Sequence, residues 1–244
     1  MCRVGLVLVI VSLVCVLEIY SDILETPYMA ALFWLHGDVY RFHCNGAIIS
    51  SRHVLTTATC VGDKVGFRNI MVRVGSSNHL YGGQEHFVEN VNKHFKFSPD
   101  LNADIAILRL SLPLKLSHRV AVLNLPEQNL SIDQVLLPKV TYYQEYFSGA
   151  PFGTLMESGT HAYLNKHECN NFFEYKFPHK DLVTDDMLCL RITYYPNNRM
   201  FGAPWVYNGT IYGLCSWDHL TSMEAPFIFT RVASFSDWIK NWIR

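Results

Sequence analysis

The sequence predicts an all-β fold, a barrel or a sandwich, because short β-branched and aromatic segments recur between turn residues along most of its 244 residues. Half of the residues are apolar and 14% are aromatic, which is enough for the core of one large domain. No repeat of 20–50 residues and no linker rich in proline or glycine divides the chain. We therefore expect a single continuous domain.

The expected strands are apolar or alternating runs bounded by turn residues such as Gly37-Asp38 and Asn208-Gly209. In chain order they are Met29–Leu35, Tyr40–Ile49, His53–Ala58, Ile70–Val74, Glu85–Val91, Ile105–Leu110, Lys139–Tyr146, His161–Leu164, Trp205–Tyr207, Ile211–Trp217 and Pro226–Val232.

Helix is expected in two places, a short one over Asn165–Phe173 and a clearer one over Ser234–Arg244. Ser234 is expected to cap the second helix, and Asp237 three residues on fits a capping-box-like start. Its apolar face, which we expect to pack against the sheets, consists of Phe235, Trp238, Ile239, Trp242 and Ile243.

The first 20 residues have the pattern of a secretory signal peptide, in which the basic Arg3 is followed by an apolar run from Val4 to Leu17. The run is short for a bilayer span. An uncleaved N-terminal anchor is the alternative. We expect a secreted, extracellular domain over residues 21–244, with an uncertain cleavage site and no membrane contact after cleavage.

The composition argues against nucleic acid, anionic membranes, metals and cofactors as ligands. Lys and Arg number 20 against 21 Asp and Glu, and the basic residues are scattered, so nothing indicates a nucleic acid or an anionic membrane as partner. The 11 histidines match no metal-ligand spacing, and no glycine-rich phosphate loop occurs, so we expect no metal and no cofactor.

Two sequons near predicted turns, at Asn129 and Asn208, are glycosylation candidates.

Several motifs follow one another in a fixed order. They are Cys-Asn-Gly-Ala-Ile-Ile-Ser at 44–50, Val-Leu-Thr-Thr-Ala-Thr-Cys at 54–60, Asp-Ile-Ala-Ile-Leu-Arg-Leu at 104–110, Arg-Met-Phe-Gly-Ala-Pro at 199–204, Ser-Trp at 216–217 and Pro-Phe-Ile-Phe-Thr-Arg-Val at 226–232. Together they resemble the trypsin and chymotrypsin family of serine peptidases. That resemblance implies two packed six-stranded antiparallel Greek-key barrels, at about 27–120 and 121–232, closed by a C-terminal helix at 234–244.

The resemblance places the catalytic triad at Thr59, Asp104 and Phe201, so the histidine and the serine are both replaced. A threonine hydroxyl has a pKa far too high for a general base, and a phenyl ring holds no nucleophilic atom. No serine lies between Ser158 and Ser216, so no other alignment of this loop would supply one. We therefore expect no turnover.

Asp104 would be costly as a buried carboxylate without partners. We expect it to be held by hydrogen bonds from Ser216, from Thr59 and from backbone amides near residues 58–60. His53, the nearest histidine before Thr59, begins its strand and is expected at the wrong end to replace the base.

Neighbouring positions depart from the family pattern as well. Arg199 stands where a glycine amide helps to form the oxyanion hole, and Met200 stands where an aspartate receives the new N-terminus after cleavage. No Ile-Val-Gly-Gly precedes Pro27, so activation by cleavage is not expected. The specificity-pocket positions correspond to Tyr195, Ser216, Asp218 and Phe227. The ring of Phe227 is expected to fill much of that pocket, unless the strand shifts and the ring packs elsewhere.

The resemblance also implies two disulfides, Cys44–Cys60 and Cys169–Cys189, as an oxidising compartment would favour. Cys215 is then left unpaired, and we expect it to be buried, an intermolecular bond being the alternative. A further family bridge is absent, because Asn197 and residues 218–221 contain no cysteine.

The function that follows is a secreted, non-catalytic serine protease homologue that binds another protein, as a cofactor, decoy or regulator of a proteolytic cascade. Its motifs look most like those of short insect members of the family. An active protease, an inhibitor or another secreted protein is the expected partner. Two alternatives stay open: an endopeptidase with residual or unconventional activity, and a glycan- or glycosaminoglycan-binding module, which would need a contiguous basic or aromatic surface.

Overall fold

The computed structural model describes residues 22–62, 66–98, 102–127, 139–143, 153–157, 161–174, 182–192, 200–217 and 226–244. The expected signal peptide lies outside the described residues, and so do the candidate positions Asn129, Tyr195, Asn197, Arg199 and Asp218. None of the helices within these ranges is long and apolar enough to cross a membrane.

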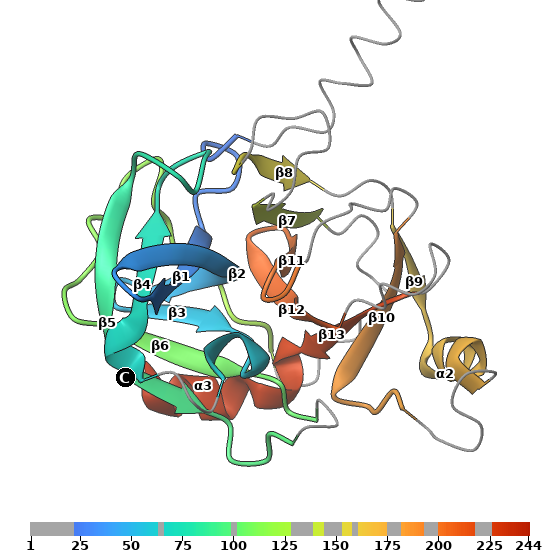
Figure 1. The fold of residues 1–244 in the computed structure, drawn as a ribbon. Coiled ribbons are helices and arrows are strands. Elements are labelled where there is room, and N and C mark those ends of the chain that lie inside the picture. The colour runs from blue at the N-terminus through green and yellow to red at the C-terminus, as the bar shows by residue number, and fades with distance from the viewer. Residues whose placement is uncertain are drawn as a thin grey trace, which may run out of the picture.

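The N-terminal part forms a closed antiparallel barrel, which confirms the first expected barrel (Figure 1). Its strands are β1 (Met29–His36), β2 (Val39–Ser50), β3 (His53–Thr56), β4 (Ile70–Val74), β5 (Gln84–Lys93) and β6 (Ala106–Leu110), joined in the order β1-β2-β3-β6-β5-β4. Apolar residues at alternate positions of these strands, such as Leu32, Val54 and Leu108, fill the interior with no exposed surface. Two short 3-10 turns, η1 (Thr59–Val61) and η2 (Phe67–Asn69), follow β3 and precede β4.

The C-terminal part forms a seven-stranded sheet in the order β8-β7-β11-β12-β13-β10-β9. Its strands are β7 (Lys139–Tyr143), β8 (Leu155–Glu157), β9 (His161–Leu164), β10 (Met187–Ile192), β11 (Pro204–Tyr207), β12 (Thr210–Trp217) and β13 (Phe227–Arg231). Within the described ranges β8 pairs only with β7 and β9 only with β10, so the sheet is open at both edges. It is therefore a half-barrel, where a second closed six-stranded barrel was expected.

Two strands were missed from the sequence, and each has a physical reason. β10 reads Met-Leu-Cys-Leu-Arg-Ile, a nearly continuous apolar run whose periodicity does not distinguish strand from buried helix. β8 has only 3 residues, too few for a pattern.

The helices lie where they were expected, but the start of the last one differs. α2 (Lys166–Glu174) follows β9, and α3 (Ser236–Trp242) follows a 3-10 turn, η4 (Val232–Phe235). Ser234 lies inside that turn and does not cap α3, whose N-cap residue is Phe235. Ser236 instead donates its hydroxyl to the carbonyl of Pro126 at 2.9 Å.

The apolar face of α3 is also shorter than expected. Phe235 and Ile239 are buried and join the cluster that holds both sheets together, with Trp238 and Ile243 partly buried beside them. Trp242, the last residue of the helix, is 46% exposed. Figure 1 shows α3 along the side of the first barrel, beneath β6.

The junction of the two sheets depends on Asn45 in β2, a fully buried polar residue. Its backbone N–H donates to the carbonyl of Phe201 at 2.8 Å, and its side-chain oxygen accepts from the N–H of Tyr143 in β7 at 2.8 Å. Its own carbonyl accepts from the hydroxyl of Thr56 at 2.8 Å. A buried amide is tolerated when its groups are bonded in this way, and here they tie the first barrel to the second sheet.

Candidate functional site

Asp104 lies just before β6 and has no exposed surface. Its Oδ1 accepts from the backbone N–H of Thr59 at 2.7 Å. Its Oδ2 accepts from the hydroxyls of Ser216 at 2.5 Å and Thr59 at 3.1 Å. The backbone of Ala58 contributes a further hydrogen bond. These are the donors expected from the sequence, so that expectation is confirmed.

Among the described residues, the groups that donate hydrogen bonds to this carboxylate are all neutral. Burial raises the pKa of Asp104, and the hydrogen bonds from Ser216, Thr59 and Ala58 act in the opposite direction. Because Thr59 donates its hydroxyl proton to Asp104, its oxygen is oriented by the carboxylate in the way a triad imidazole would be. The hydroxyl cannot then exchange a proton near neutral pH, so this pair positions no general base.

Residues 200–203 form a tight turn. The N–H of Ala203 donates to the carbonyl of Met200 at 2.8 Å, and the N–H of Gly202 donates to the carbonyl of Cys215 at 2.8 Å. Gly202 has φ +75°, and a Cβ there would lie 2.0 Å from the carbonyl oxygen of Asn45. Only glycine fits this approach of the turn to β2. Phe201 is the second residue of this turn.

The ring of Phe201 is partly buried and packs against the interior cluster of the first barrel. That cluster contains Ala58 and Cys60, the two residues that flank Thr59. The structure therefore brings Thr59, Asp104, Ser216 and Phe201 into one region, where the phenyl ring is an apolar contact between the turn and the first barrel.

Met200 and Phe227 are buried in the core of the second sheet. Their exposed fractions are 0% and 2%, and they share a cluster with Trp205, Phe229 and Cys215. Met200 thus packs as an apolar residue, where an aspartate would need a charged partner. The expected filling of a specificity pocket by Phe227 stays a prediction, because Tyr195 and Asp218 lie outside the described residues.

Both expected disulfides are present, Cys44–Cys60 between β2 and η1 and Cys169–Cys189 between α2 and β10. Cys215 is a buried thiol in β12, as expected. Asn208 is exposed in the β11–β12 turn with φ +52°, so its sequon is accessible.

His53 pairs with Arg109 across β3 and β6, whereas Thr56, at the other end of β3, pairs with Ala106. The expectation that His53 lies at the wrong end of the strand to serve Asp104 is confirmed. No group of three potential metal ligands occurs in the part of the chain that the structure describes.

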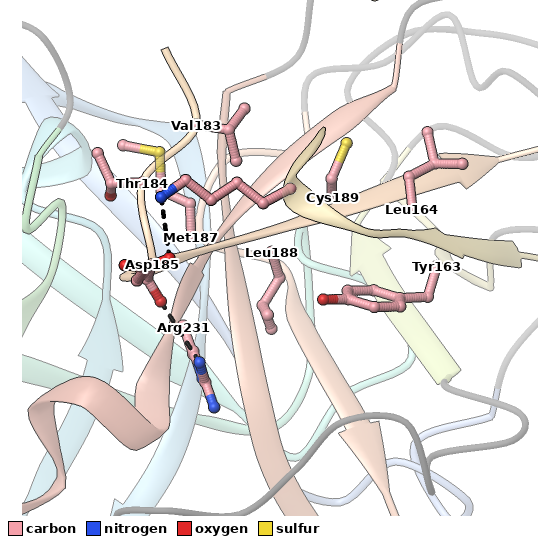
Figure 2. A pocket seen from close by; sticks show the side chains of 10 residues that line it. Tyr163, Leu164, Val183, Thr184, Asp185, Met187, Leu188, Cys189 and Arg231 are labelled. Carbon is pink, nitrogen blue, oxygen red and sulfur yellow. Dashed lines mark hydrogen bonds and ion pairs between the residues drawn. The ribbon is translucent and has the colours of Figure 1, made fainter. Parts of the chain in front are cut away.

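Figure 2 shows a small cavity between β9, β10 and the residues before β10. Lys166 Nζ lies 3.0 Å from the carboxylate of Asp185, whose carbonyl accepts a long hydrogen bond from Arg231 at 3.5 Å. The cavity volume is about 70 Å³. That space holds a few waters and is far below the several hundred Å³ of ligand sites, so we assign it no substrate.

The comparisons with known proteins agree with this geometry. The family described as Trypsin matches residues 21–239 of the chain. This chain belongs to the trypsin family. Within it, the chain is similar to Trypsin 5G1 of Aedes aegypti, at 26% identity over 89% of this chain and 80% of that protein. It is also similar to Trypsin-4 of Rattus norvegicus, at 28% identity over 88% and 84%.

Solved structures with the same fold include two described as scabies mite inactivated protease paralogues. S-D1 has a TM-score of 0.80 at 21% identity and covers 93% of this chain and 96% of its own. S-I1 has a TM-score of 0.79 at 26% identity and covers 91% and 96%.

Asn45 was not predicted from the sequence as part of this site, although its motif carries a signal for such a role. The residue stands in Cys-Asn-Gly, where the family motif reads Cys-Gly-Gly. A polar residue at a glycine position next to a buried disulfide needs partners, and the turn at 200–203 supplies one of them.

Proposed function

We propose that this chain is a secreted, non-catalytic member of the trypsin family that acts by binding another protein. The observation that carries the proposal is the set of donors around Asp104. A triad aspartate orients a histidine, whereas Asp104 is held by Ser216 and Thr59, and the hydroxyl of Thr59 is directed at the carboxylate.

Phe201 supports the same proposal. Its ring packs against the first-barrel core, the cluster that includes both cysteines of the disulfide Cys44–Cys60. The resemblance to the family puts its nucleophile at this position of the turn. Without a nucleophilic atom, acyl transfer through a covalent intermediate has no first step. In a protease studied by mutation, loss of the serine or the histidine alone lowers turnover by a factor of about 10⁶.

Secretion is supported by the two disulfides, which form and persist in oxidising compartments. The similarity to proteins described as inactivated protease paralogues also favours a family member retained without catalysis. A stable trypsin-like fold that lacks turnover still offers a large, rigid surface, and an active protease, an inhibitor or another secreted protein would be its partner.

Catalysis and binding are tested separately. For catalysis, the purified chain and an active trypsin are each incubated with peptide esters, and the release of the alcohol product is followed. We expect this chain to hydrolyse the esters no faster than they hydrolyse without enzyme. Hydrolysis above the uncatalysed rate that is blocked by a serine-directed inhibitor would support the residual endopeptidase instead.

For binding, the tagged chain captures proteins from the fluid in which it occurs, with a catalytically inactivated trypsin as the matched bait. A partner captured by this chain alone is expected, and equal capture by both baits would count against a specific binding role.

A further inference from the structure

A second surface of the molecule combines positive charge, amides and an exposed indole in one cleft. The cleft has a volume of about 340 Å³ and lies where the end of α3 meets β5 and the turn between β2 and β3. Its lining includes the guanidinium, imidazole, amide and indole groups of Arg52, His53, Asn90, Asn92, Arg109 and Trp242. Arg244 also lines it.

The cleft is distinct from the site at Asp104. Arg109 pairs with His53 at one end of the β3–β6 ladder, and Ala106 pairs with Thr56 at the other. Strands rise about 3.3 Å per residue, so the two ends are about 10 Å apart. A ligand in the cleft would therefore bind without contacting the Asp104 carboxylate.

Arg52 presents an unsatisfied donor. Its Nη2 donates to the carbonyl of Ser111 at 2.8 Å, which fixes the guanidinium. Its Nε is buried and has no hydrogen-bond partner among the described residues. Because Nε is closed to solvent, Arg52 would act on an anion in the cleft through its positive charge and through guanidinium N–H groups other than Nε.

Arg109 adds a second guanidinium, which is only partly neutralised. Its Nε lies 2.8 Å from the carboxylate of Glu89, and the two side chains are 49% and 35% exposed. An exposed pair of this kind is weak, and a planar guanidinium offers further N–H groups beyond the one that Glu89 uses.

His53 lines the cleft beside both arginines. Burial lowers its pKa first, the charges of Arg109 and Arg52 lower it further, and Glu89 raises it. Its Nδ1 lies 2.8 Å from the hydroxyl of Ser50, so the ring is held in place. The imidazole is thus a neutral hydrogen-bonding group in a cleft where the arginines outweigh the nearby carboxylate.

The cleft also offers an aromatic face and two amides, from Trp242, Asn90 and Asn92. Trp242 is 46% exposed at the end of α3, and a flat aromatic face can pack against the apolar face of a sugar ring. The two amides stand on the same face of β5, two residues apart, and can bond hydroxyl groups as donors and acceptors. The volume lies at the lower end of the range for small-ligand sites and suits one or two sugar rings.

We propose that this cleft binds a sulfated oligosaccharide, with the guanidinium groups of Arg52 and Arg109 on a sulfate group and with Trp242 against a sugar ring. Guanidinium groups bind such tetrahedral anions through paired hydrogen bonds, and sulfate keeps its charge at any physiological pH.

The test is titration calorimetry of the full-length secreted chain with a heparin-derived tetrasaccharide at low salt. Binding that weakens as salt is added is expected, because the cleft is open to screening ions. Arg109→Gln is expected to weaken binding by about ten-fold, the usual effect of losing a hydrogen bond to a charged group. Trp242→Ala is expected to weaken it by at least a few-fold.

Two matched controls exclude general effects of charge and aromatic content. Arg191→Gln removes one charge from an exposed position in β10, and Phe95→Ala removes a ring that is 80% exposed. Both should bind as the wild type does, and circular dichroism should be the same for all four variants. If Arg191→Gln weakens binding as much as Arg109→Gln, or if Trp242→Ala has no effect, the proposal is wrong.

Three other ligands decide the chemical class. A non-sulfated tetrasaccharide of the same length, inorganic sulfate and a poly-glutamate peptide should each bind at least about ten-fold more weakly. Equal binding of any of them would overturn the assignment to a sulfated sugar. Since the cleft is separate from Asp104, these outcomes do not depend on whether the chain proves to be catalytic.

Discussion

Ser216 offers a direct measure of how Asp104 is stabilised. Its hydroxyl donates to the carboxylate at 2.5 Å, and the two residues are 3% and 0% exposed, so water cannot replace the bond. Hydrogen bonds to charged groups contribute about 1.5–3 kcal/mol, against about 1 kcal/mol for neutral pairs. We therefore expect Ser216→Ala to lower the free energy of unfolding by about 2 kcal/mol wherever Asp104 is ionised in the folded state.

The pH dependence follows from the direction of the pKa shift. Burial raises the pKa of Asp104 above its unfolded value, so the folded state binds the proton more tightly and loses stability as pH rises from the unfolded pKa through the folded one. Ser216→Ala removes a bond that favours the ionised form, so it raises this pKa further. Its cost should be about 1 kcal/mol below the unfolded pKa and about 2 kcal/mol above the folded pKa.

The assay is urea unfolding followed by tryptophan fluorescence, with the disulfides intact, from pH 3.5 to pH 8. Ser236→Ala is the matched control, because that buried hydroxyl donates to a neutral carbonyl, the one of Pro126, at 2.9 Å. Its cost should be about 1 kcal/mol and independent of pH. A cost for Ser216→Ala that is below 0.5 kcal/mol, or that does not change with pH, would refute the reasoning.

Two other predictions concern the turn at residues 200–203 and the disulfide Cys44–Cys60. Gly202→Ala should destabilise the protein by at least about 2 kcal/mol, because the new Cβ would lie 2.0 Å from the carbonyl of Asn45. Gly209→Ala should cost only about 1 kcal/mol, because Gly209 has a similar φ of +71° but open space around it. Equal urea midpoints for the two variants would contradict this. Replacing both Cys44 and Cys60 with alanine should lower the free energy of unfolding by about 2–4 kcal/mol, since the bond closes a loop with a sequence separation of 16, and an unchanged urea midpoint would show that the bond adds nothing.

The sequence predicted those parts of the site that follow from local pattern and from the cost of burial. Asp104 needed donors once it was placed in a buried strand end, and Ser216 and Thr59 were the hydroxyls that the family pattern brought near it. Short β-branched and aromatic segments between turn residues predicted every strand of the first barrel to within a few residues. These features are local or follow from a known order of motifs.

Features that depend on distant packing were not predictable in the same way. The cleft joins Arg52, Arg109 and Trp242, which come from separate parts of the chain, so basic residues that look scattered in the sequence gather on the surface. Helical periodicity placed Trp242 on the buried face of α3, but the helix ends at that residue and its ring stays 46% exposed. The open edges of the second sheet likewise depend on pairing between strands, which no single segment encodes.

The proposed function requires that this trypsin-family chain has no reactive nucleophile. The most direct test is intact-mass spectrometry after treatment with a fluorophosphonate probe that labels activated serines, alongside an active trypsin. We expect the trypsin to gain the mass of one probe less HF and this chain to keep its own mass, because Phe201 has no hydroxyl and Ser216 donates its proton to Asp104. A stoichiometric adduct on the chain, mapped by peptide sequencing to Ser216, Thr59 or another hydroxyl, would contradict it.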